Sequence, residues 1–197
     1  MPYPAQIDPR RLGLDALQVV EELEKNDWSL REVAGRLGVS PNALYRYVDD
    51  RAGLAILMGE AAARALMASG FRGVAGTGDE AVVRMSLNFI RFATRRPHAY
   101  FAFMNAKPEL DHPSMVAWFE LWAKVNALVR SAVPDSGDAA AFSLWALLHG
   151  RIELFRGAAY RAPVDAGLED AVRALLEGYR QGGPHPSPLP PHARLDP

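Results

Sequence analysis

Apolar residues recur at intervals of three and four along most of the chain, whereas the strict alternation typical of strands is nearly absent. This period predicts four helices in the first part of the sequence, at 10–26, 29–37, 41–47 and 50–70. Five more are predicted further on, at 79–95, 98–106, 113–133, 138–159 and 167–181. The breaks between the later helices coincide with Pro97, Pro108, Pro113, Pro134 and Pro163, because proline cannot continue a helix. The pattern predicts an all-α fold.

The second predicted helix has a recognisable beginning and end. Ser29 and Glu32 have the spacing of a capping box, in which each side chain accepts a hydrogen bond from the backbone N–H of the other residue. The apolar residues that follow, up to Leu37, fall on one face at helical spacing. Gly38 comes next, where the chain needs a left-handed conformation that glycine adopts most easily.

A third helix is predicted to begin at once. Ser40 is a favoured N-cap, and Pro41 at the first helical position loses no hydrogen bond. Val39 and Leu44 are expected to point to the core, and Asp49-Asp50 to cap the next helix. The remaining surface of this very short helix carries polar and aromatic side chains, namely Asn42, Ala43, Tyr45, Arg46 and Tyr47.

Two short helices joined by a tight glycine turn are the sequence form of a helix-turn-helix, whose second helix enters the major groove of DNA. The alternative is an ordinary helical hairpin inside an all-helical core. That alternative accounts for the apolar positions but not for the outward-facing Asn, Tyr and Arg. We therefore favour DNA binding.

Residues 12–54 resemble the N-terminal domain of the TetR family of transcriptional regulators. The family pattern is an Ala-x-x-x-Gly-Val-Ser turn, a Leu-Tyr-x-x-Phe-like recognition helix and a basic residue at the start of the next helix. This chain has Ala34, Gly38-Val39-Ser40, Leu44-Tyr45 and Arg51 in those places. It departs from the pattern at Tyr47, where His is usual, at Val48, where Phe is usual, and at Trp28 in the linker.

The resemblance and the outward surface together predict a site for a double-stranded DNA operator. Its residues are Ser29, Arg31, Ser40, Pro41, Asn42, Ala43, Tyr45, Arg46, Tyr47 and Arg51. Tyr45 and Arg51 are expected to contact phosphates and fix the register. Pro41, Asn42, Ala43 and Arg46 are expected to face bases, with Asn suited to adenine and Arg to guanine.

Charge complicates this prediction. The net charge of the chain is −1, and residues 1–60 hold seven Lys and Arg against ten Asp and Glu, a formal −3. Within residues 29–48, however, three Arg stand against one Glu. Because the salt dependence of DNA binding follows the number of neutralised phosphates, we expect weak non-specific binding and a modest salt dependence.

The composition limits the class of protein and the cellular location that we expect. The chain has 197 residues, 49% of them apolar, which is enough for a sizeable core. It lacks cysteine, which excludes disulfides and thiolate chemistry and is compatible with a reducing cytoplasm. We expect a cytoplasmic protein that does not bind a membrane, because neither a secretory signal nor an apolar run near ~20 residues stands out.

Three segments are predicted: residues 1–56 as the helix-turn-helix DNA-binding domain, 57–181 as a helical ligand-binding and dimerisation domain, and 182–197 as a disordered tail. The tail is rich in Pro and His and poor in apolar residues. Glycines at 70, 73, 76 and 78 predict a loop. A phosphate site there is not favoured, since no strand precedes these glycines and no Gly-Lys-Ser/Thr follows.

Aromatic residues are concentrated in the second half, and core packing is the default interpretation of each. Their density around 89–122 nevertheless predicts an apolar pocket with a few polar groups, of which Asn88 and Asn126 are further candidates. The predicted ligand-binding residues are Phe89, Phe92, Phe101, Met104, Asn105, Trp118, Trp122, Trp145 and His149.

The segment Trp145-Ala-Leu-Leu-His149-Gly150 is similar to a Trp-His-Gly signature in one group of TetR-family C-terminal domains. That resemblance implies a homodimer formed by the helices near 138–159 and 167–181. Gly150 in mid-helix suggests a close helix crossing. The apolar stripe of the last helix suits an interface and a monomer core equally well: Leu168, Ala171, Val172, Leu175, Leu176 and Tyr179.

No cofactor or metal is predicted. His149 and Glu153 lie four residues apart on one helix, but two ligands do not make a site, and Asp111-His112 is distant in sequence. An enzyme is not favoured, because the sequence offers no nucleophile elbow, carboxylate pair or cofactor loop. The leading hypothesis is a homodimeric repressor controlled by a small apolar or aromatic ligand. A helical protein-interaction module, or a DNA-binding protein without an effector, is the alternative.

Overall fold

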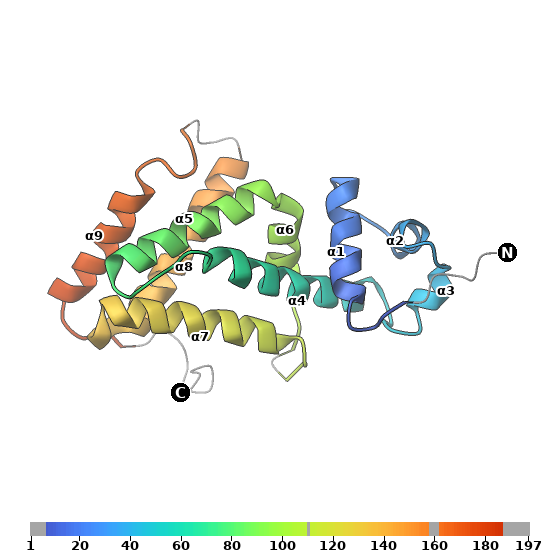
Figure 1. Cartoon of the computed structure of the whole chain (residues 1–197), viewed down its shortest axis with the longest axis horizontal. Coiled ribbons are helices and arrows are strands. Elements are labelled where there is room, and N and C mark those ends of the chain that lie inside the picture. The colour runs from blue at the N-terminus through green and yellow to red at the C-terminus, as the bar shows by residue number, and fades with distance from the viewer. Residues whose placement is uncertain (1–6, 110, 158–161, 187–197) are drawn as a thin grey trace. The chain divides into compact units, whose positions relative to one another are not determined.

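The computed structural model describes residues 7–109, 111–157 and 162–186, and these residues are helical without strands. Figure 1 shows the arrangement of the helices in chain order. Their bounds are α1 Leu12–Leu23, α2 Leu30–Arg36, α3 Pro41–Leu44, α4 Arg51–Gly70, α5 Asp79–Arg95, α6 Pro97–Asn105, α7 Met115–Ala132, a 3₁₀ turn Pro134–Ser136, α8 Gly137–Arg156 and α9 Leu168–Gln181. The all-α prediction is confirmed, and the observed helices begin and end within three residues of the predicted ones. Residues 158 and 159 of the predicted helix 138–159 lie outside the described residues.

The described residues fall into two compact units. The first combines residues up to Leu66 with Arg96–Trp118, and the second combines Met67–Arg95 with the chain from Phe119 onward. A segment from the middle of the sequence therefore joins the N-terminal helices. The predicted functional division at residues 56 and 57 does not follow this boundary and stays a prediction.

In the first unit, α1 packs against α2 and α6, and α2 lies beside α3 (Figure 1). Its core includes Leu17, Leu44 and Leu54, each with no exposed surface. Gly13 of α1 allows a close approach to α4, since a Cβ there would lie 2.3 Å from the carbonyl oxygen of Leu57. Any larger residue at position 13 would push α1 away from α4.

Polar contacts also fix α6 to α1 within this unit. The Arg96 guanidinium donates two hydrogen bonds to the Glu21 carboxylate, at 2.8 and 2.6 Å. His98 Nδ1 lies 2.8 Å from Asn26 Oδ1. A paired, two-point Arg–carboxylate contact has a defined geometry as well as favourable energy. It therefore sets the position of the start of α6 relative to α1.

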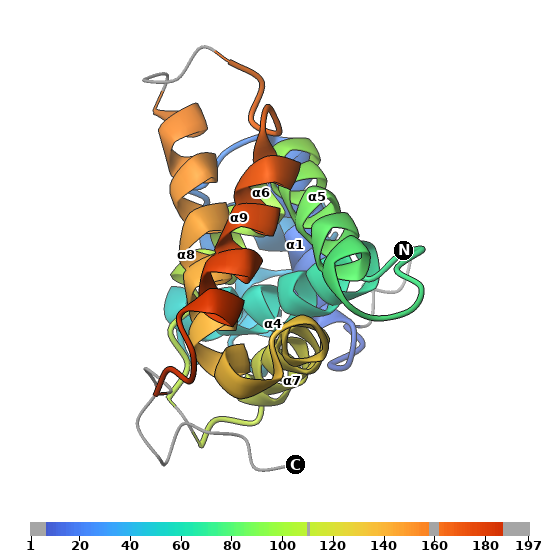
Figure 2. The same ribbon diagram turned by 90° about the vertical axis from the view of Figure 1, so that its left-hand side faces the viewer.

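In the second unit, α5, α8 and α9 pack against one another, as Figure 2 also shows. The apolar stripe of α9 contributes three residues to this core, because Leu168, Val172 and Leu176 have no exposed surface in the monomer. Ala171 and Leu175 are half-buried. Core burial, rather than a partner chain, thus accounts for half of the stripe.

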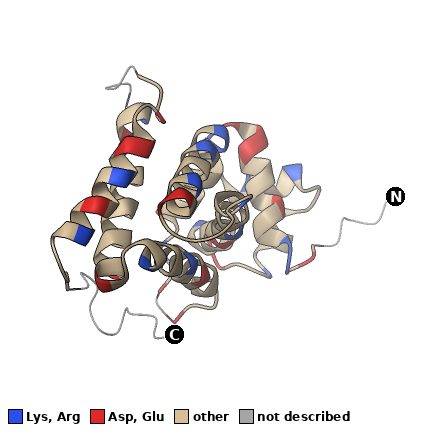
Figure 3. Ribbon diagram, turned by 60° about the vertical axis from the view of Figure 1, so that its left-hand side comes forward, with Lys and Arg blue, Asp and Glu red and all other residues tan. Residues whose placement is uncertain are grey.

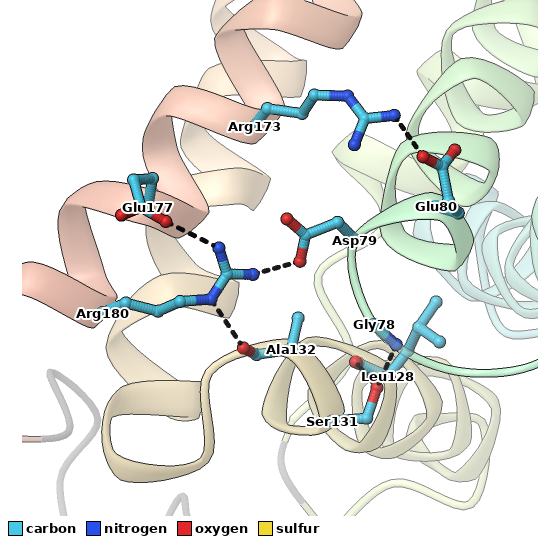
Figure 4. A network of polar contacts seen from close by, with 9 residues as sticks. All are labelled: Gly78, Asp79, Glu80, Leu128, Ser131, Ala132, Arg173, Glu177 and Arg180. Carbon is cyan, nitrogen blue, oxygen red and sulfur yellow. Dashed lines mark hydrogen bonds and ion pairs between the residues drawn. The ribbon is translucent and has the colours of Figure 1, made fainter.

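Ion pairs join α9 to the start of α5 (Figure 4). Arg173 bonds to Glu80 at 2.6 Å, and Arg180 pairs with Asp79 while donating to the Ala132 carbonyl oxygen at 3.2 Å. The glycine-rich loop that precedes α5 is present as predicted, with positive φ at positions 73, 76 and 78. The ion pairs to Asp79 and Glu80 therefore hold the start of α5, where the glycine-rich loop ends, against α9.

Two expectations for the C-terminal half need comment. Gly150 is exposed, and a Cβ added there would meet no described residue within 4 Å, so the expected helix crossing is not made by the described part of the chain. Of the tail 182–197, residues 187–197 lie outside the described residues. The remainder contacts Ser136, whose Oγ donates to the Gly183 carbonyl and accepts from the His185 N–H.

Among the described helices, α4 alone is long and apolar enough to cross a membrane by length and composition. The apolar residues of α4 also form part of the protein core, since Leu54, Met58 and Leu66 of the first unit are only 0–1% exposed. Glu60 and Arg64 interrupt the apolar sequence and pair with each other at 3.0 Å.

Candidate nucleic-acid interface

The helix-turn-helix begins with the predicted capping box. Ser29 Oγ accepts from the Glu32 N–H at 3.2 Å, and the Glu32 carboxylate accepts from the Ser29 N–H at 2.9 Å. Lys25 also bonds to this carboxylate, and together with the bonds from Ser29 it lowers the pKa of Glu32 to about 2. An ionised Glu32 near the N-terminus of α2 is favourable for the helix dipole.

The turn has the form of a Schellman motif. Gly38 has a φ of +72°, its N–H bonds to the Gly35 carbonyl, and the Val39 N–H reaches back to the Ala34 carbonyl at 3.0 Å. These bonds satisfy carbonyls that the end of α2 would otherwise leave open. The conformation required at position 38 explains the glycine there.

The helix α3 is capped by Ser40, whose Oγ accepts from the Ala43 N–H at 3.3 Å, with Pro41 as its first residue. The helix proper ends at Leu44, earlier than the predicted residue 47. The backbone continues as turns, since the Tyr47 and Val48 N–H groups both bond to the Leu44 carbonyl. Burial of Leu44 and Val48, at 0% and 7% exposure, fixes one side of this segment to the core.

The other side of α3 and its following turn faces solvent. Tyr45 is 53% exposed and Tyr47 is 40% exposed. Aromatic side chains of this size are usually buried in a core, so their exposure is notable. Asn42 and Arg46 are exposed as well, whereas Pro41 and Ala43 are half-buried. The structure therefore brings the expected base-facing residues onto one segment that follows the exposed N-cap Ser40, and Ser29, the N-cap of α2, is exposed as well.

Arg51 has a role that the sequence did not reveal. Its Nε donates to the Trp28 carbonyl at 2.9 Å, its Nη2 donates to the Asn26 carbonyl at 3.0 Å, and its guanidinium lies 4.5 Å from the Trp28 ring centroid. Arg51 thus ties the start of α4 to the loop between α1 and α2. The signal available in the sequence was Trp28, a large aromatic residue in a linker.

Charge in the rest of the molecule is mixed. In the view of Figure 3, Lys and Arg are interspersed with Asp and Glu along individual helices. On α2, Arg31 and Arg36 are exposed, while Glu32 is half-buried in its capping contacts. The positive charge around α3 therefore comes from a few separate arginines.

The predicted ligand-binding residues divide between the two units. Phe101, Met104, Asn105 and Trp118 belong to the first, where Asn105 donates to the Phe101 carbonyl at 2.9 Å. Met104 is 40% exposed. The second unit holds Phe89, Phe92, Trp122, Trp145 and His149.

His149 is the centre of an aromatic cluster in the second unit. Its ring centroid lies 4.2 Å from that of Trp145 and 5.4 Å from that of Phe89, both edge to face. Trp122 packs on Trp145 at 6.1 Å. Burial lowers the pKa of His149 to about 4, so its imidazole is neutral at pH 7.

The asparagines proposed as polar groups of a pocket have structural contacts. Asn88 donates to the carbonyls of Gly70 and Arg72, at 3.1 and 2.9 Å, and so holds the glycine-rich loop. Asn126 can accept from Trp122 Nε1 at 2.7 Å when its amide is oriented to donate to Asp138. Within the described residues, no three His, Asp or Glu side chains gather as a metal site.

These observations define an all-α protein with a helix-turn-helix near its N-terminus. No family model matches the sequence, and no curated protein matches it either. Solved structures do match. A possible TetR-family transcriptional regulator from Streptomyces coelicolor A3(2) is 18% identical, with a TM-score of 0.65 over 89% of this chain and 100% of its own.

Two further structures agree. TetR from Acinetobacter baumannii AYE is 15% identical, with a TM-score of 0.66 over 91% of this chain and 100% of its own. The fatty acid degradation regulator FadR from Bacillus halodurans is 11% identical, with a TM-score of 0.66 over 88% of this chain and 97% of its own. The chain therefore has the fold of TetR-family transcriptional regulators.

Proposed function

We propose that this protein is a DNA-binding transcriptional regulator of the TetR type, acting as a homodimeric repressor under the control of a small apolar or aromatic ligand. The observation that carries the proposal is the exposure of Asn42, Tyr45, Arg46 and Tyr47 on a segment whose other side is fixed by buried Leu44 and Val48. A helix held in this way can present side chains to a groove with little loss of conformational freedom on binding.

The roles divide by chemistry. Asn42 and Arg46 are suited to bidentate contacts with adenine and guanine, and Pro41 and Ala43 leave room for close approach to the base edges. Tyr45, Tyr47 and Arg31 can bond to phosphates, as can the exposed hydroxyl of Ser40. The Ser29 hydroxyl donates to the Glu32 carboxylate at 2.8 Å, so a phosphate contact at Ser29 would replace that bond. Arg51 keeps its proposed phosphate contact, but its bonds to the loop make it a support for the interface as well.

A homodimer through α8 and α9 is supported by the exposed face of α8. Phe142 and Leu154 are 45% and 56% exposed, and Gly150 between them leaves space for a partner helix to approach. Gly178 on α9 is likewise exposed and open. Isologous pairing would bury these faces and place two recognition helices in successive major grooves, about 34–36 Å apart.

Ligand control is supported by the cluster around His149. A neutral imidazole among Phe89, Trp122 and Trp145 offers one polar group in apolar surroundings, which is the composition of small-molecule sites. Phe92, Phe101, Met104, Asn105 and Trp118 remain proposed contacts. A ligand would change DNA affinity only by its different affinity for the two conformations of the dimer.

A mobility-shift experiment with the DNA upstream of the protein's own coding region tests the proposal, and we expect retarded probe. Asn42→Ala and Arg46→Ala should relax base preference, whereas Tyr45→Phe and Arg31→Ala should weaken binding to all sequences. Arg72→Ala is the matched control, because Arg72 is exposed in the second unit. Absence of retardation across neighbouring intergenic regions would contradict a repressor and favour a protein-interaction module.

Titrating the bound probe with a panel of apolar and aromatic small molecules tests ligand control. We expect at least one compound to release the DNA from the wild type but not from His149→Phe. Release by no compound, with DNA binding intact, would favour a DNA-binding protein without an effector. Sedimentation equilibrium of Leu154→Glu against the control Leu14→Glu, both exposed leucines, tests the dimer.

A further inference from the structure

We propose that the first unit contains a second ligand site, a cavity between α1, α4 and α6 that takes a small aromatic carboxylate and whose occupation weakens DNA binding. The cavity has a volume of about 240 Å³ and is lined from all three helices and from the loop before α2. Its effect on DNA rests on the proposed function. The binding of the carboxylate does not.

The deep wall of the cavity is apolar. Met58, Val20 and Trp28 line it and are buried at 1%, 2% and 5% exposure. Ala55 and Ala102 face it from α4 and α6 with short side chains, which is what leaves the space open. This wall favours the ring of a ligand, since apolar surface removed from water is the main source of affinity.

The rim of the cavity carries polar groups. Arg51 lines it with Nε and Nη2 bonded to backbone carbonyls and, among the described residues, has no carboxylate partner for its charge. Asn26 and His98 line it side by side, 2.8 Å apart, and Asn105 lies one turn beyond Phe101 on α6. The guanidinium is fixed through Nε and Nη2, and its Nη1 bonds to none of the described residues, so it is a good partner for a carboxylate.

Size narrows the ligand further. Pockets for drug-sized molecules measure roughly 300–1,000 Å³, so this cavity suits something smaller. An apolar cavity of about 150 Å³ is known to hold benzene. A single aromatic ring with one carboxylate therefore matches the volume, the apolar wall and the cationic rim together.

Occupation would act on DNA through Arg51. A carboxylate bound at the rim offsets the charge of this arginine, which the proposed interface places near a phosphate. The same ligand would also contact the loop at Asn26 and Trp28, to which the start of α4 is tied. DNA and the carboxylate thus compete for one charge, and each lowers the affinity of the protein for the other to the same degree.

Benzoate is the probe, and benzamide, which has the same ring without the charge, is the matched comparison. In the full-length protein without DNA, we expect nuclear Overhauser effects between the benzoate ring protons and the Met58 methyl group. We expect benzamide to bind about tenfold more weakly, since it lacks the charge-assisted bond. Ala55→Leu should abolish benzoate binding by filling the cavity, and Ala68→Leu, exposed on the same helix, should leave it unchanged.

Absence of the Met58 signal at saturating benzoate, or equal affinity for the two probes, overturns the site. This measurement uses the wild type, so it decides even if Ala55→Leu does not fold. With DNA present, benzoate should raise the Kd for DNA in the wild type but not in Ala55→Leu, and an unchanged Kd overturns the coupling. A protein that binds benzoate at Met58 but no DNA would contradict the proposed function and leave the ligand site established.

Discussion

The guanidinium of Arg51 lies over the indole of Trp28, 4.5 Å from the ring centroid, and donates to the carbonyl oxygen of the same residue at 2.9 Å. The Trp28 side chain is only 5% exposed, whereas Arg51 is exposed. The contact therefore links a charged surface side chain to a ring in the core. The first residue of α4 thereby fixes the loop that leads into α2, and with it the first helix of the helix-turn-helix.

Arg51→Lys should destabilise the first unit although it keeps the charge. A lysine cannot bond both carbonyls and stack on the ring at once, and we expect a loss of about 1–2 kcal/mol in the free energy of unfolding. Urea unfolding followed by tryptophan fluorescence measures it. Arg46→Lys is the control, and as an exposed substitution it should change stability by less than about 0.5 kcal/mol. Equal effects of the two variants would contradict a supporting role for Arg51.

Glu32 should make stability depend on pH in the acid range. Its bonds to Lys25 and Ser29 lower its folded pKa to about 2, below the roughly 4.3 of an unfolded chain. The ionised carboxylate therefore stabilises the fold above about pH 4, and this contribution is lost as the pH falls towards 2. Wild type and Glu32→Gln should differ at pH 7 and converge near pH 2 in urea unfolding. The control Glu22→Gln, exposed on α1, should show no such convergence.

His149 should destabilise the second unit at mildly acidic pH. Burial lowers its folded pKa from 6.5 to about 4, so the unfolded chain takes up a proton first. Stability is full above about pH 7 and falls as the pH drops from 6.5 to 4, by up to roughly 3 kcal/mol. His149→Gln should remove this part of the pH profile, measured by thermal unfolding from pH 8 to about pH 4. The control His112→Gln should still lose stability between pH 6.5 and 4. If it did not, the pH dependence could not be attributed to His149.

The ion pairs between α9 and α5 should contribute modestly and in a salt-dependent way. A double-mutant cycle of Asp79→Asn and Arg180→Met should give a coupling of about 0.5–1 kcal/mol, since exposed pairs are worth little unless they form a network. The coupling should shrink in about 1 M salt, where the screening length is only ~3 Å. Arg84→Met, an exposed arginine of α5, should show no salt-dependent effect. A coupling near zero at low salt would mean that the network in Figure 4 contributes no stability.

Salt should affect DNA binding less than it does for strongly basic repressors. Each neutralised phosphate adds about 0.9 to the slope of log K against log salt, and the interface offers few arginines. Fluorescence anisotropy at several salt concentrations measures the slope, and Arg31→Ala should reduce it by about 1 per protomer. A slope as steep as −10, close to that of a strongly basic repressor, would show that phosphate contacts have been missed.

Much of the helix-turn-helix could be predicted from local sequence because its determinants are local. The capping box of Ser29 and Glu32, the positive φ of Gly38 and the proline start of α3 each involve residues a few positions apart. Such signals act through the backbone of one turn and do not depend on distant segments. The one clear discrepancy, the early end of α3 at Leu44, concerns a helix too short for its periodicity to define an end.

The candidate ligand, interface and helix-crossing residues were less predictable, because spacing along a helix does not say which neighbour covers a face. Three residues of the α9 stripe proved to be core, Gly150 proved to be open, and Asn88 proved to hold a loop. Each of these outcomes depends on packing between helices far apart in sequence. The hydrophobic pattern alone could not distinguish a monomer core from an interface.

By itself, the sequence determined the helical class, the helix boundaries apart from the end of α3, and the turn that presents Asn42, Tyr45 and Arg46, since these follow from periodicity and capping. Only the tertiary structure decided that α6 joins the N-terminal helices, that Arg51 supports the loop at Trp28, and that a cavity opens beside them. The physical reason is that these features arise where segments far apart in the sequence are brought into contact, as Glu21 and Arg96 are across 75 residues. Local sequence carries no signal for such long-range contacts.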